Sequence, residues 1–324
     1  MSAVKWVGVS PIPGGESIRD LKEYARSGKY GDFVSDNIAW LIRCCATYRD
    51  YFQSPLPMLG IREDLGVSGR DILFDLYSSA YFKGVGDYRD LSKLNVCPYC
   101  GLRNSVGLDH YLPRRTADFP HLSFLSTNLV PSCDACQSKK GIFFPKGWPV
   151  KVKWVKRRHG NSRVMRLYKN PIRTSGGGAR IRTTSRFIHP YLDGKIDVRK
   201  IGVGFEFDNV IGPYNFKVVY IGGKGSPQAK LVKFHFSKLE MPSRLLDPLR
   251  KVWDSLVPYL FDPADPARNE ADVKRRISAL ARQKREQSGL LSMEALFLES
   301  VASSSDCISL LLKNYVPPPR NKRK

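Results

Sequence analysis

Two pairs of closely spaced cysteines constrain the fold of this 324-residue chain more than any other feature. Cys97 and Cys100 form one Cys-x-x-Cys pair, and Cys133 and Cys136 form the other. A tight turn can aim both thiolates of a pair at one ion, and Zn²⁺ suits four sulfur ligands in a tetrahedron. Because four thiolates leave no open coordination position, we predict a structural rather than a catalytic zinc. The competing interpretation is four cysteines that bind no metal.

The other cysteines, Cys44, Cys45 and Cys307, lie in apolar, helix-like contexts. An odd total of seven argues against a disulfide framework, and a free cysteine behaves as a small hydrophobic residue. We therefore assign these three thiols to the core. Residues 101–132 separate the two pairs, a loop too long to be ordered without packing or a metal.

That loop contains Asp109-His110 and, shortly before the second cysteine pair, Asn128. The order Cys-x-x-Cys, Asp-His, Asn, Cys-x-x-Cys and a following Lys strongly resembles HNH endonucleases with a zinc-stapled ββα-metal fold. The resemblance runs from Cys97 to Gly141 and says little about the rest of the chain.

The resemblance implies a metal-dependent enzyme that hydrolyses phosphodiester bonds in DNA. His110 would be the general base, since an imidazole titrates near neutral pH. Asp109 would ligate a catalytic Mg²⁺ or Mn²⁺. In this family the residue that matches Asn128 braces the loop that orients the base.

One position departs from the family pattern. The residue after the last cysteine is usually His or Asn, and here it is Gln137. An amide oxygen can still ligate a hard cation, so we predict Gln137 as a second ligand of the catalytic ion. The alternatives are an altered metal geometry or an inactive relic.

The chain is strongly basic, with 53 Lys and Arg against 30 Asp and Glu and a formal charge of +23. Nucleic acid is the commonest partner of such a protein, and the alternatives are an anionic membrane surface or mere solubility. The charge is concentrated, because Ala135 to Leu192 contains fifteen Lys and Arg and no acidic residue.

We expect nine basic side chains to contact phosphates. Arg114 and Arg115 flank the predicted base, and Lys139 and Lys140 are expected on the exposed side of the helix that carries Cys136. The others belong to an extended basic ribbon after the cysteine module: Lys151, Lys153, Lys156, Arg157 and Arg158.

The pattern of apolar residues predicts an α+β protein, namely a ββα-metal HNH core with a structural zinc between two flanking regions. From Val203 to Phe236, short alternating runs predict a small antiparallel sheet, and helices are predicted near 243–261, 268–287 and 290–313. The predicted regions are a mainly helical 1–94, the nuclease module 95–145, the basic segment 146–192, an α+β region 193–316 and a basic tail 317–324.

No apolar run approaches the ~20 residues that cross a bilayer, and residues 1–13 lack a basic start followed by an apolar stretch. We therefore predict a cytoplasmic protein without a membrane segment. The setting suggested by the resemblance is bacterial restriction or anti-phage defence, with a possible partner subunit. Two other functions stay open: a zinc-dependent nucleic-acid-binding protein without catalysis, and a nuclease that cuts RNA.

The basic ribbon yields a first testable expectation. Changing Lys151, Lys153, Lys156, Arg157 and Arg158 together to neutral residues should weaken binding to duplexes of any sequence. The slope of log K against log salt concentration should flatten by up to about 0.9 per lost phosphate contact. Binding titrations over a range of salt measure this slope, and an unchanged slope would show that the ribbon is only a solvated surface.

Overall fold

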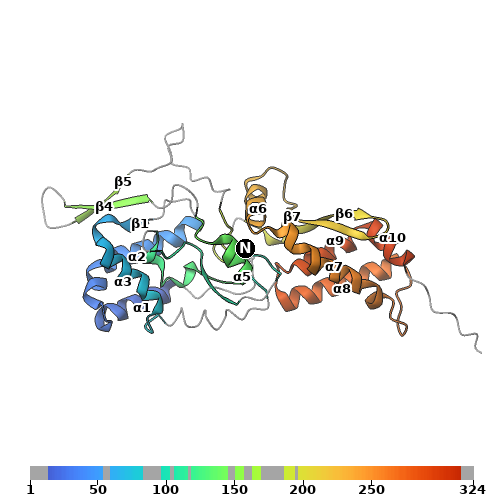
Figure 1. Ribbon diagram of the computed structural model, residues 1–324, viewed down its shortest axis with the longest axis horizontal. Coiled ribbons are helices and arrows are strands. Elements are labelled where there is room, and N and C mark those ends of the chain that lie inside the picture. The colour runs from blue at the N-terminus through green and yellow to red at the C-terminus, as the bar shows by residue number, and fades with distance from the viewer. Residues whose placement is uncertain are drawn as a thin grey trace, which may run out of the picture.

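The computed structural model describes residues 14–53, 59–82, 96–102, 106–115, 118–144, 150–156, 163–168, 186–193 and 196–314. These residues form a mixed helix and sheet structure, as the sequence predicts. The described strands make a three-stranded sheet and two separate two-stranded sheets. Figure 1 shows the N-terminal helices at one end of an elongated molecule, the C-terminal helices at the other and α5 between them.

The described part of the N-terminal region is mainly helical. Its elements are α1 (Gly14–Ser27), α2 (Gly31–Gln53), β1 (Leu59–Arg62) and α3 (Gly66–Asp75), with short 3-10 turns at Glu63–Leu65 and Leu76–Ser78. Trp40, Leu41 and Tyr48 of α2 are fully or almost fully buried. The apolar spacing of α2 therefore marks a core face.

The cysteine module contains a two-stranded sheet followed by a helix. Its elements are β2 (Gly107–His110), 3-10 turns at Pro120–Leu122 and Ser126–Asn128, β3 (Leu129–Ser132) and α5 (Asp134–Lys140). β2 and β3 are antiparallel, with Asp109 opposite Val130 and His110 opposite Leu129. The predicted catalytic pair thus lies at the end of β2 that leads into the loop towards Asn128.

The basic segment forms a hairpin of β4 (Val150–Lys156) and β5 (Arg163–Tyr168). This agrees with the extended ribbon expected from the sequence, and it places Lys151, Lys153 and Lys156 on β4. Arg157 and Arg158 lie outside the described residues. β4 also pairs in parallel with β1, so the basic segment and the N-terminal region share one sheet rather than forming separate units.

The C-terminal region contains an antiparallel pair and five helices among its described residues. Its elements are β6 (Ile201–Asp208), β7 (Gly212–Tyr220), α6 (Pro227–Lys238), α7 (Met241–Leu260), α8 (Glu270–Ser288), α9 (Met293–Ala302) and α10 (Ser305–Lys313).

Two predicted boundaries in this region are wrong. The predicted sheet ends earlier than Phe236, because Ser226 accepts a hydrogen bond from the Ala229 amide and Pro227 occupies the first turn of α6. The single helix predicted over 290–313 is two helices, because Ser304 caps a new helix by accepting a hydrogen bond from the Cys307 amide. In both places a serine cap starts a helix inside a segment that the sequence pattern assigned to a single element.

The C-terminal region is attached to the cysteine module at Tyr99 and Gly101. The ring of His235 on α6 is hydrogen-bonded to the Tyr99 carbonyl at 2.8 Å, and the Met293 amide donates to the Gly101 carbonyl at 3.1 Å. Gly101 has a φ of +68°, and a Cβ there would lie 2.0 Å from the Leu291 carbonyl oxygen. Only glycine permits this close approach.

Among the described helices, no single one is long and apolar enough to cross a membrane. α9 and α10 reach the required length and composition only as a pair, and they are bent by 84° at their junction.

Candidate metal centre and active site

The four cysteines of the two pairs form one buried cluster. Their Sγ atoms all lie within 4.8 Å of one another, and the Sγ atoms of Cys100 and Cys133 are 3.8 Å apart. Four sulfurs at about 2.3 Å from the centre of a tetrahedron are separated by about 3.8 Å, the spacing of a zinc–thiolate site. The cluster can therefore hold a structural metal such as zinc.

A side chain that sequence reasoning did not find, Arg244 of α7, lies against this cluster. Its guanidinium donates to the Sγ of Cys136 and of Cys100, each at 3.4 Å, and to that of Cys133 at 3.6 Å. Burial disfavours the charged guanidinium, but the nearby cysteines raise the pKa of Arg244 above its usual range. The cation offsets part of the negative charge that four thiolates bring to a metal site.

His110, the predicted base, is held in one orientation. Its Nε2 lies 3.0 Å from the Ser123 carbonyl oxygen, which can only accept, so Nε2 carries the proton and Nδ1 keeps its lone pair. The ring of Tyr77 packs edge-on at 4.8 Å, and the residue keeps some exposure to solvent. Burial lowers the pKa of His110 to about 3, so the imidazole is neutral at physiological pH.

Asn128 is fully buried and ties together the loop around His110. Its Oδ1 accepts from the Leu112 amide at 2.9 Å, and its Nδ2 donates to the carbonyls of Leu112 and Leu122 at 3.1 and 3.2 Å. Leu122 directly precedes Ser123, whose carbonyl holds the imidazole. These contacts suit the bracing role predicted for Asn128.

Asp109 is held by two donors. The ammonium of Lys140 lies 2.9 Å from its Oδ2, and the Tyr99 hydroxyl donates to the same oxygen at 2.9 Å. Burial raises the pKa of Asp109, and both donors oppose that rise. The carboxylate is therefore close to His110 in the chain but already paired with a cation.

The expectation that Lys140 is exposed on α5 is wrong. Lys140 is 2% exposed, and its ammonium also donates to the His110 carbonyl at 2.8 Å. The side chain turns inward because the buried Asp109 requires a countercharge. Its neighbour Lys139 is exposed and pairs with Glu240 at 2.6 Å.

The two arginines beside the base are placed differently. The guanidinium of Arg114 lies over the rings of Phe74 and Tyr77, at 4.2 and 4.4 Å from their centroids. Arg115 is half exposed and pairs with Asp118 at 3.6 Å. Phosphate contacts by these side chains stay a prediction.

Gln137 lies near the other end of β2. Its amide nitrogen donates a hydrogen bond to the Ser132 carbonyl at 3.3 Å. The same nitrogen lies close to Gly107, because a Cβ added to that glycine would be 3.2 Å from it. Gly107 is two residues from Asp109 along β2. The Asp109 carboxylate contacts Lys140 and Tyr99, and Gln137 is not among its hydrogen-bond partners in the described part of the chain. Metal binding by Gln137 therefore stays a prediction.

No family model matches the chain, and no curated protein or solved structure is significantly similar to it. The site is therefore interpreted from its own geometry.

The cysteine cluster predicts how metal and fold depend on each other. Cys97→Ser or Cys133→Ser should lose zinc and lower the thermal midpoint, because the binding energy of a structural zinc is folding energy. Cys307→Ser, which changes a buried cysteine outside the cluster, should keep one zinc per chain. Metal analysis and thermal denaturation measure both effects. A zinc-free wild type with normally melting cluster variants would refute the metal site.

Proposed function

We propose that this protein is a metal-dependent endonuclease of the HNH type, and that DNA is its substrate. The observation that carries the proposal is the neutral imidazole of His110. It is fixed through Nε2, keeps its lone pair on Nδ1, and lies next to Asp109 on a strand braced by the cysteine module.

The proposed reaction needs a group that takes a proton from water as the water attacks phosphorus. A histidine with a lowered pKa is unprotonated at physiological pH, but the same shift makes it a weaker base, so the imidazolium must be stabilised as it forms. The hydrogen bond from Nε2 to the Ser123 carbonyl would stabilise the imidazolium that forms, since that carbonyl dipole favours the positive ring.

The Asp109 carboxylate is the group suited to hold Mg²⁺ or Mn²⁺, since hard cations prefer oxygen ligands. When bound, such an ion supplies positive charge for the phosphate oxygens that gain charge during hydrolysis. Asp109 keeps about 12% exposure, so an ion could reach it. Binding would require Lys140 to share or release the carboxylate.

Basic residues in and beside the module support a nucleic-acid substrate. Phosphate contacts do not distinguish DNA from RNA, so RNA is the second substrate to test. A role in bacterial restriction or anti-phage defence, with a partner subunit, belongs to the same proposal and rests on analogy.

The ion pair of Asp109 with Lys140 favours a second candidate function. If Lys140 permanently neutralises Asp109, the protein would bind nucleic acid without cutting it. Incubating purified zinc-loaded protein with plasmid or RNA and Mg²⁺ or Mn²⁺ separates the two functions.

The role of His110 leads to a direct test. His110→Gln should reduce cleavage by ~10²-fold or more, because the amide cannot act as a base. Zinc content and affinity for uncut DNA should match those of the wild type, since neither depends on the imidazole. Plasmid nicking, metal analysis and a binding titration give the three readouts. Nicking at the wild-type rate by a well-folded variant would eliminate His110 as the base.

The Asp109–Lys140 pair allows metal binding to be measured without activity. Lys140→Met should cost about 3–5 kcal/mol of stability, because it leaves a carboxylate without its cation. If Asp109 can ligate Mg²⁺, millimolar Mg²⁺ should raise the thermal midpoint of this variant more than that of wild type. The matched control is Asp109→Asn with Lys140→Met, which should not respond. An equal Mg²⁺ effect on all three proteins would remove Asp109 as a ligand.

A further inference from the structure

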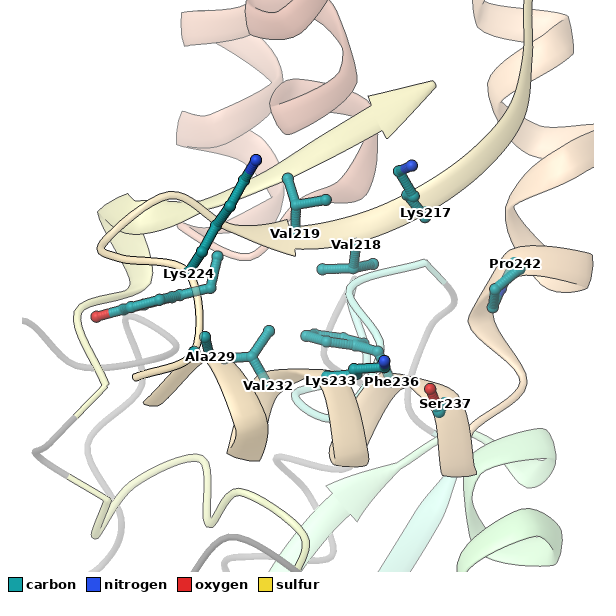
Figure 2. A pocket seen from close by; sticks show the side chains of 12 residues that line it. Lys217, Val218, Val219, Lys224, Ala229, Val232, Lys233, Phe236, Ser237 and Pro242 are labelled. Atoms are coloured by element: carbon teal, nitrogen blue, oxygen red, sulfur yellow. The ribbon is translucent and has the colours of Figure 1, made fainter. Parts of the chain in front are cut away.

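A pocket of about 420 Å³ lies between β7 and α6, far along the chain from the proposed catalytic residues. Figure 2 shows Val218 on the strand above, with Val232 and Phe236 on the helix below. Most of the wall is aliphatic or aromatic carbon, and the volume falls in the range of natural binding sites. Such a pocket suits apolar side chains.

The pocket is also bounded by the backbone of β7. Residues 217–220 are consecutive and all four line the pocket, although strand side chains alternate between two faces. Side chains from both faces of β7 therefore reach the cavity, as they would where a pocket wraps around the edge of a strand. β7 pairs with β6 along its other edge, and no other strand in the described part of the chain pairs with this one. An unpaired edge offers N–H and C=O groups to an added strand.

The mouth of the pocket is positively charged. Lys217, Lys224 and Lys233 line it from the strand, the following loop and the helix, and all three are exposed. No acidic residue is among its described lining residues. Asp197 is near enough to the lining residue Tyr220 for its charge to add to the rise that burial causes in the pKa of that tyrosine. The Asp197 carboxylate is, however, paired with Arg199 at 2.9 Å. An occupant of this pocket should therefore be acidic as well as partly apolar.

We propose that β7 and α6 form a docking site for an extended acidic segment of a partner protein. The segment would pair with the open edge of β7, place an apolar side chain against the partly exposed Val218 and Ala229, and set carboxylates beside the three lysines. The basic tail of this chain, 317–324, is unsuited by charge. Backbone pairing separates this mode from nucleic-acid binding, which would need only the lysines.

The test uses a fluorescein-labelled peptide with the sequence Glu-Val-Glu-Val-Glu and the full-length, zinc-loaded protein. Its fluorescence anisotropy should show saturable binding below about 1 mM, the weak end of specific association. In a second version of this peptide, alternate amides are N-methylated. This version keeps its charge, but along one of its edges it has no N–H groups left to donate to β7. It should bind at least ~10-fold more weakly, since two or more hydrogen bonds are lost.

Matched variants separate the pocket from general electrostatic attraction. Lys217→Glu, Lys224→Glu and Lys233→Glu together should weaken peptide binding at least ~10-fold. The equally charged control, Lys22→Glu, Lys230→Glu and Lys274→Glu, changes exposed lysines outside the pocket and should have a much smaller effect. Ala229→Trp, which fills the pocket without changing charge, should also weaken binding.

Three results would overturn the proposal. The first is no saturable binding by the wild type, and the second is equal binding of the N-methylated peptide. The third is an equal loss in both triple variants. If a thymidine octamer binds wild type but loses affinity on Ala229→Trp while the peptide does not, the pocket serves nucleic acid instead.

Discussion

Four thiolates gathered around one point are the constraint on which the rest of the molecule depends. As thiolates they would repel one another, and a metal together with the guanidinium of Arg244 could supply the offsetting charge. The cluster joins the start of the module to α5, and Arg244 brings in α7. Loss of this centre would therefore weaken the link between the module that carries Asp109 and His110 and the C-terminal helices, leaving the contacts at Tyr99 and Gly101.

The arrangement of the proposed active site also depends on the N-terminal helices. The carbonyl of Ser123 fixes the His110 ring, while the hydroxyl of the same serine donates to the Leu73 carbonyl on α3 at 2.5 Å. Tyr77, just after α3, packs against the imidazole. The orientation of the base is thus set by contacts from outside the cysteine module, although the residues that would do chemistry all lie within it.

Spacing in the sequence was enough to predict the cysteine cluster and the basic ribbon, because each is signalled by short patterns of residues close together in the chain. Arg244 was missed because it reaches Cys100 across 144 positions, and such a contact leaves no periodic signal. Lys140 was placed on the wrong side of α5 for a related reason. The charge that draws it inward belongs to Asp109, on a strand that only the fold brings near. The HNH character of the site rests on the motif and is still a proposal.

The parallel pairing of β1 with β4 has a consequence for how the chain is made. Leu59 lies opposite Val150, so the whole cysteine module is synthesised between the two partners. During translation β1 emerges first and must wait, unpaired, until the module and β4 have followed. Completion of the β1–β4 sheet is thereby delayed until the cysteines are present, so a metal could bind the cysteine cluster before the sheet that carries the basic ribbon is complete.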